Sequence, residues 1–166
     1  MCIRDRVASG RDRARLLAHR NEQELRAHVA ASAGFFGLSP AEYEDVPEPD
    51  GYIEAGDALK VGSLVARALF TPGHSPGHLS LFYPSVDALL QGEEGEEPFR
   101  GPLLIAGDVL FQGTIGRTDL PGGDMATLLR SVREQIFVLP DETRILCGHG
   151  GDTTVGDEKR TNPFFQ

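Results

Sequence analysis

The sequence predicts an α/β fold in which a β-sheet is covered on one face by helices. The first observation is a series of short apolar runs of strand length, typical of buried strands. These runs occupy residues 63–70, 79–83, 102–107 and 144–147. The second observation is an amphipathic helix between the last two runs, which begins at Asp124 as N-cap and reaches about Phe137. Strands that alternate with a helix of this kind favour a sheet with one helical layer.

The third observation is that a glycine followed by His or Asp comes after three of these runs. The pairs are Gly73–His74, Gly107–Asp108 and Gly148–His149. Strand ends at one edge of a sheet bring together side chains from distant parts of a chain. Imidazole and carboxylate are good ligands for zinc or iron, so the pattern predicts a metal site. Taken singly, each residue is better explained as a polar side chain that closes a strand.

Composition limits the classes of function. The chain has 166 residues and a formal net charge of −9, which suits one acidic globular domain. Six of the 16 Lys and Arg, but only two of the 25 Asp and Glu, lie in the first 20 residues. The acidic remainder argues against nucleic acid as a partner. No apolar run approaches the roughly 20 residues of a membrane span, and two cysteines cannot form a disulfide framework, so we expect no membrane partner and a cytoplasmic setting.

The N-terminal third predicts a short strand at residues 14–19 and a helix from Asn21 to Ala33. Asn21 would be its N-cap, with Glu24 as the capping-box partner. His19 and His28 are interpreted as boundary or half-solvated residues, although His19 lies near a strand end and could approach a site. Residues 35–56 read as a loop with one helical turn at Pro40.

The remaining elements follow from turn residues between apolar segments. A strand at Ala58–Val61 pairs with residues 63–70 across Gly62. The acidic segment 91–97 predicts an exposed hairpin extension. The glycine-rich loop 113–123 lacks the spacing of a phosphate-binding loop. The tail from Gly150 to Gln166 is polar until Pro163-Phe164-Phe165.

Several segments together resemble a known family. They are Thr71-Pro72-Gly73-His74-Ser75-Pro76-Gly77-His78, Ala106-Gly107-Asp108-Val109-Leu110-Phe111, Cys147-Gly148-His149-Gly150, Gly116-Arg117-Thr118-Asp119 and Glu158-Lys159-Arg160-Thr161-Asn162-Pro163-Phe164. They are similar to the later motifs of the metallo-β-lactamase fold superfamily, in its glyoxalase II-like (hydroxyacylglutathione hydrolase-like) branch. The resemblance covers residues 14–166 and implies an αβ/βα sandwich that is incomplete in its N-terminal half. Residues 1–13 are expected to be non-native or disordered, since Met1–Arg6 resembles a translated adapter.

The resemblance also implies roles for individual residues. His74 would bind the first of two zinc ions, His149 the second, and Asp108 would bridge both and orient the hydroxide. Iron or manganese could replace zinc. His78, Arg117 and Asp119 would support the ligands without binding metal. Two further basic residues, Lys159 and Arg160, could meet an anionic substrate or lie on the surface without a role in the site.

The family's first metal motif, His-X-His-X-Asp-His, does not occur in this sequence. Because that motif supplies the other ligands, we expect this chain to be an N-terminally truncated form that is inactive by itself. It would form the C-terminal part of a single domain.

The chemistry implied for the complete enzyme is hydrolysis of a small-molecule thioester, glutathione-like in type, by a metal-bound hydroxide. The alternatives are a persulfide dioxygenase-like enzyme with one iron, or a fragment without catalysis. A Cys147–His149 nucleophile pair is geometrically conceivable, because residues two apart share one face of a strand. A buried strand cysteine explains Cys147 better.

Overall fold

The computed structural model describes residues 15–92 and 95–166, and it divides into two compact units. The first unit is Met1–Ile53 and the second is Glu54–Gln166. The prediction for residues 1–13 lies outside the described residues. Within the described ranges, no helix is both long and apolar enough to cross a membrane.

The first unit is built from very short elements. Strand β1 (Leu17–Ala18) pairs in parallel with β2 (Gly51–Tyr52). Between them lie short helical segments: η1 (Arg20–Glu22), α1 (Gln23–Arg26), α2 (Val29–Ser32), η2 (Ala33–Phe36) and η3 (Pro40–Glu42). The helical turn expected at Pro40 is confirmed as η3.

The single helix predicted from Asn21 to Ala33 is wrong, because the helix breaks at His28. The ring Nδ1 of His28 lies 2.7 Å from the carbonyl oxygen of Glu24. In a continuous helix that carbonyl would accept from the backbone N–H of His28, which instead bonds to Leu25 O. The predicted N-cap is also wrong, since His19 Nδ1 accepts from the Asn21 N–H and caps η1.

The second unit holds a six-stranded sheet in the order β10-β9-β6-β5-β4-β3. Its strands are β3 (Ala58–Val61), β4 (Leu64–Phe70), β5 (Leu79–Gly92), β6 (Gly95–Gly107), β9 (Arg144–Cys147) and β10 (Thr153–Thr154). Only the β6–β9 pair among these is parallel. The expected hairpin extension is confirmed, and it makes β5 and β6 longer than the predicted apolar runs. A separate pair, β7 (Leu110–Phe111) and β8 (Thr114–Ile115), forms a small hairpin.

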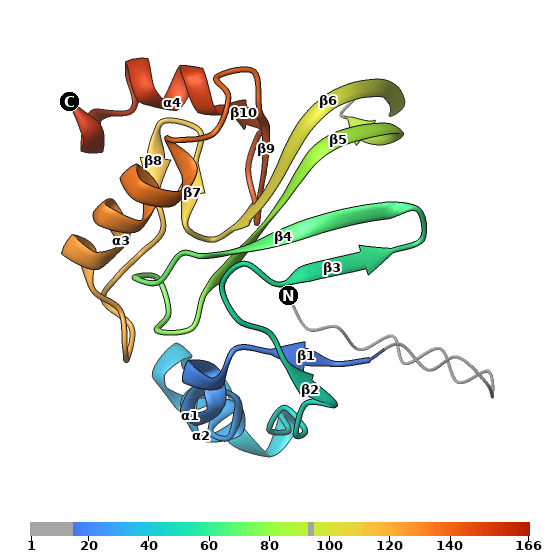
Figure 1. Cartoon of the computed structure of the whole chain (residues 1–166). Coiled ribbons are helices and arrows are strands. Elements are labelled where there is room, and N and C mark those ends of the chain that lie inside the picture. Colours follow the sequence, from blue (N-terminus) through green and yellow to red (C-terminus); the bar gives the residue numbers. More distant parts are fainter. Residues whose placement is uncertain (1–14, 93–94) are drawn as a thin grey trace. The chain divides into compact units, whose positions relative to one another are not determined.

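Helices cover one face of this sheet, as Figure 1 shows for α3 and α4. Helix α3 (Met125–Ser131) begins at Asp124, whose Oδ1 accepts from the Thr127 N–H at 2.7 Å. It continues into a wider π-helical turn, η4 (Val132–Ile136), closed by the Phe137 N–H on Val132 O. The predicted helix is therefore confirmed in start and extent.

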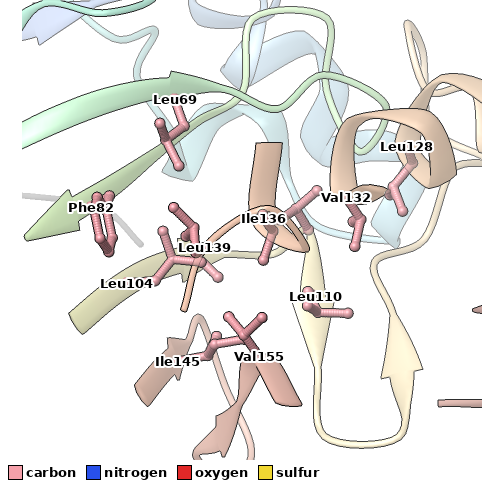
Figure 2. Close-up of a cluster of buried hydrophobic side chains, with 12 residues drawn as sticks. Leu69, Phe82, Leu104, Leu110, Leu128, Val132, Ile136, Leu139, Ile145 and Val155 are labelled. Carbon is pink, nitrogen blue, oxygen red and sulfur yellow. The ribbon is translucent and has the colours of Figure 1, made fainter. Parts of the chain in front are cut away.

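The core lies between the helices and the sheet (Figure 2). Leu104 and Ile145, in register on β6 and β9, are fully buried against the helical layer. The helix residues of this cluster are Leu128, Val132, Ile136 and Val155. A smaller cluster of Ala66, Tyr83, Val86 and Leu103 forms on the other face, because neighbouring strand residues point to opposite faces.

The tail over residues 150–166, a polar segment for which the sequence predicted no element, contains a helix. Helix α4 (Val155–Thr161) is followed by the short turn η5 (Pro163–Phe165). Thr154 is its N-cap: its Oγ1 accepts from the Asp157 N–H at 3.1 Å. A Thr with Asp three residues later is a capping signal that the sequence carried.

Candidate metal centre

The structure places the three predicted ligands at one edge of the sheet. His74 lies on the turn after β4, Asp108 follows β6, and His149 follows β9. His74 Nε2 lies 4.0 Å from Asp108 Oδ2, and His149 Nδ1 lies 3.4 Å from Asp108 Oδ1. Each imidazole therefore faces a different oxygen of the same carboxylate.

The turn that carries His74 rests directly on α3. The Gly73 carbonyl accepts from the Asp124 N–H, and the Pro72 carbonyl accepts from Ser131 Oγ, both at 2.8 Å. Gly73 has φ of 130°, and a Cβ there would overlap the backbone of Leu128. Glycine is therefore required at this close approach, and the helix fixes the turn.

The orientation of His74 follows from one hydrogen bond. Its Nδ1 lies 2.9 Å from the backbone carbonyl of Arg117, which can only accept, so Nδ1 carries the proton. With the proton on Nδ1, Nε2 is the nitrogen that faces Asp108 and can bind a metal. Arg117 itself is held by Asp119 through two bonds of 2.8 Å. The Arg117 side chain, by hydrogen bond and charge, lowers the pKa of Asp119 to about 2.

Asp108 sits in a cradle of glycines. The Gly148 N–H donates to the Gly107 carbonyl at 2.8 Å, which draws the end of β9 onto the end of β6. A Cβ at Gly148 would overlap Asp108 Oδ1, and a Cβ at Gly116 would overlap the Asp108 carbonyl oxygen. The chain can approach Asp108 on two sides only because neither position carries a side chain.

His78 ends a chain of hydrogen bonds beneath the site. Ser80 Oγ donates to the Ala106 carbonyl at 3.3 Å. Its only proton is then used, so it accepts from Thr71 Oγ1 at 2.9 Å. Thr71 Oγ1 in turn accepts from His78 Nδ1 at 2.9 Å. The unprotonated Nε2 of His78 abuts Gly107, where a Cβ would lie 2.7 Å away.

The surroundings of His78 keep its ring neutral. Burial is the main reason that the pKa of His78 is lowered to about 4, and the charge of the nearby His74 lowers it further. The carboxylate of Asp108 acts in the opposite direction and raises the pKa. His78 is therefore a neutral wedge at Gly107, one residue before Asp108. This placement is compatible with the predicted supporting role.

The three predicted ligands border a pocket of about 440 Å³. Its wall includes the β7–β8 hairpin, whose Phe111 ring lies 4.3 Å from the His149 ring, centroid to centroid. The pocket is lined by His74, Asp108, Phe111, Gln112, Thr114, Ile115, Gly116, Arg117, His149, Gly150 and Gly151. The sequence alone assigns no role to the hairpin residues, because their place in the pocket wall depends on long-range contacts.

Other candidate residues lie outside this pocket lining. Lys159 bonds to Asp141 at 2.6 Å, and Arg160 bonds to Asp157 at 2.7 Å, on and beside α4. Their predicted role with an anionic substrate stays a prediction. Burial raises the pKa of the Cys147 thiol to about 11, which disfavours a thiolate nucleophile.

The donors fit a divalent metal in chemistry but only partly in number. His74, Asp108 and His149 offer nitrogen and oxygen atoms that can bind a metal, and the facing atoms lie 4.0 and 3.4 Å apart. Among residues 15–92 and 95–166, however, no three His, Cys, Asp or Glu side chains gather closely enough to hold an ion alone. The three residues form two pairs that share Asp108. A catalytic zinc ion takes three protein ligands and water, so these pairs supply part of such a coordination sphere.

Comparison with known proteins identifies the fold. Residues 7–149 match the family model of the metallo-beta-lactamase superfamily. The chain belongs to this superfamily. This match confirms the predicted metallo-β-lactamase fold and places the chain in a superfamily of metal-binding hydrolases.

Two curated relatives and a solved structure illustrate the likeness. Over 147 residues the chain is 40% identical to the probable metallo-hydrolase YqgX of Bacillus subtilis, covering 89% of this chain and 62% of that protein. Over 118 residues it is 41% identical to the hydroxyacylglutathione hydrolase GloC of Haemophilus influenzae, covering 70% and 49%. The crystal structure of TTHA1623 in a di-iron-bound form gives a TM-score of 0.69 at 34% identity, covering 89% and 63%.

The chain therefore spans about half to two thirds of the length of these two relatives. The hydrolase GloC among them agrees with the glyoxalase II-like branch that the motifs predicted.

Proposed function

We propose that this chain carries metal-binding residues of a metal-dependent hydrolase that cleaves thioesters of the hydroxyacylglutathione type. The observation that carries the proposal is the convergence of His74 and His149 on the two oxygens of Asp108 in an open pocket. The likeness to GloC supports the substrate class. Because the chain spans only part of its relatives, the activity proposed is that of a protein of their length.

The roles of this chain's residues follow from their contacts. His74, Asp108 and His149 would hold the metal, which we propose to be zinc, although a structural neighbour is described in a di-iron form. A divalent ion supplies Lewis acidity, which eases the deprotonation of water and polarises a carbonyl group. Asp108 would orient both imidazoles, one at each carboxylate oxygen. It would also accept a hydrogen bond from a water molecule that approaches the substrate. The Arg117 carbonyl keeps His74 in the tautomer that can bind metal.

The pocket suits a small acyl group beside the ligands. Ile115 and Phe111 give it an apolar wall, whereas Gln112 and Thr114 offer polar groups on the same hairpin. No nucleic-acid partner is proposed, because the net charge is −9. The cytoplasmic setting stays a prediction.

The test is release of free thiol from a hydroxyacylglutathione by a zinc-loaded protein in which this chain is extended to the length of its relatives, followed with a thiol reagent. Zinc-dependent release that Asp108→Asn abolishes would support the hydrolase. Zinc bound by that extended protein without any release would refute thioester cleavage. Oxygen uptake with a glutathione persulfide by the iron-loaded form of the same extended protein would favour the dioxygenase alternative instead.

A further inference from the structure

A buried carboxylate on α4, outside the ligand set, ties that helix to the pocket wall. Glu158 is only 1% exposed. Its Oε1 accepts from Thr153 Oγ1 at 2.6 Å, and its Oε2 accepts from the backbone N–H of Gly113 at 3.0 Å. Burying a carboxylate is costly unless it is hydrogen-bonded. This position is therefore explained by the bonds that Glu158 makes.

Asn162, just after the same helix, makes a second tie. Its Nδ2 donates to Glu158 Oε2 at 2.7 Å and to the backbone carbonyl of Thr114 at 3.1 Å. Its Oδ1 accepts from the Phe164 N–H at 3.1 Å, so both ends of the amide are used. Asn162 is fully buried. The side chain thus has one orientation that satisfies every partner.

The two ties grip the β7–β8 hairpin at its turn. They bond to Gly113 and Thr114, the residues that follow Phe111 and Gln112. A two-stranded hairpin with two-residue strands is not stable by itself. The position of the Phe111 ring therefore depends on the hold that α4 has on this turn.

The Phe111 ring faces the ligand with the least support. His149 lies between two glycines, and its side chain is 73% exposed. Few contacts restrict such a ring, but Phe111 packs on it at 4.3 Å while Asp108 faces Nδ1 at 3.4 Å. If the hairpin moved, His149 would lose the contact that limits its rotation.

We propose that Glu158 and Asn162 are positioning residues of the metal centre: they fix the β7–β8 hairpin, and Phe111 on that hairpin fixes His149. The inference rests on the proposed metal-dependent function, because the orientation of His149 matters only if His149 binds a metal. Its physical content is the orientation of one ring, which can be measured without metal or substrate. Groups that orient metal ligands affect metal affinity about 10- to 100-fold.

The experiment compares Glu158→Met with Glu158→Gln in the 166-residue chain. Gln keeps an acceptor oxygen for Gly113 and a donor for Thr153, whereas Met keeps the bulk and loses both. NMR of the metal-free, histidine-labelled chain reports the ring-current shift that Phe111 exerts on His149. We expect Glu158→Met to lose this shift and to raise the zinc Kd about 10-fold. Glu158→Gln should retain the wild-type shift and Kd.

Two further variants make the result specific. Glu142→Gln removes an exposed carboxylate and should change neither readout. In the double variant Glu158→Met/Phe111→Leu, zinc Kd should equal that of Phe111→Leu alone, because both changes act through one contact.

A folded Glu158→Met chain with the wild-type His149 shift and zinc Kd would overturn the proposal. If Glu158→Met does not fold, Phe111→Leu decides: a Kd raised about 10-fold supports the proposal, and an unchanged Kd overturns it. The NMR readout does not depend on thioester hydrolysis, so failure of the hydrolase proposal would be seen separately.

Discussion

Gly148 packs so closely on Asp108 that no side chain fits between them, because a Cβ at Gly148 would overlap Oδ1 of the carboxylate. We expect Gly148→Ala to displace the Asp108 side chain and to weaken zinc binding about 10-fold or more, as for other residues that orient ligands. Competition with a chromogenic chelator measures the Kd. Gly34→Ala is the matched control, since a Cβ there meets nothing within 4 Å. Equal zinc affinity in both variants would refute this account of the cradle.

Because α3 supports the turn that carries His74, truncating a buried residue of this helix should destabilise the fold. Leu128 is fully buried and lies directly under Gly73. Leu128→Ala removes core packing and should lower the free energy of unfolding by about 2–5 kcal/mol, the usual range for buried Leu-to-Ala changes. Urea denaturation measures it, with the exposed Met125→Ala as control. A loss no larger than that of the control would contradict the packing described.

The Arg117–Asp119 pair predicts a pH dependence. Arg117 lowers the pKa of Asp119 from 3.8 to about 2 in the folded chain. The stabilising effect of the pair is therefore complete above the unfolded pKa near 4 and is lost as the pH falls through about 2. Carboxyl ¹³C NMR should show Asp119 titrating near pH 2, and Arg117→Met should move the midpoint toward 3.8. A midpoint that Arg117→Met leaves in place would exclude Arg117 as the cause.

The thiol of Cys147 is predicted to be unreactive at neutral pH. Burial raises its pKa to about 11, so little thiolate forms below pH 9. In a Cys2→Ser background, alkylation by iodoacetamide at pH 8 should be at least 10-fold slower than in urea-unfolded chain, since a shift of each pKa unit changes the thiolate fraction tenfold. Equal rates in folded and unfolded chain would revive a nucleophilic role for this cysteine.

Local signals in the sequence were sufficient where packing agreed with them. The Asp124 cap and the apolar stripe of the following helix predicted α3 and η4, because Leu128 and Ile136 do bury that stripe. The break at His28 could not be predicted, since it depends on the ring competing for the Glu24 carbonyl. The helix α4 could have been found from Thr154 and its capping partner.

For the site, the repeated glycine-ligand pairs predicted His74, Asp108 and His149, and the structure brings all three together. Strand direction explains this. β6 and β9 are parallel neighbours, and β4 runs in the same direction as β6 because both pair antiparallel with β5. The hairpin wall with Phe111 and the tie from Glu158 could not be predicted. Both depend on contacts more than 30 residues apart in the chain, for which no local pattern exists.

The most direct test of the central claim is a zinc titration of the chain and its single variants by chelator competition. If His74, Asp108 and His149 form the metal centre, His74→Ala, Asp108→Asn and His149→Ala should each weaken zinc binding at least 10-fold. His28→Gln, which changes a ring bonded to a helix carbonyl, should leave the Kd unchanged. Zinc affinity unchanged in all three ligand variants, or an equal loss in His28→Gln, would contradict the account.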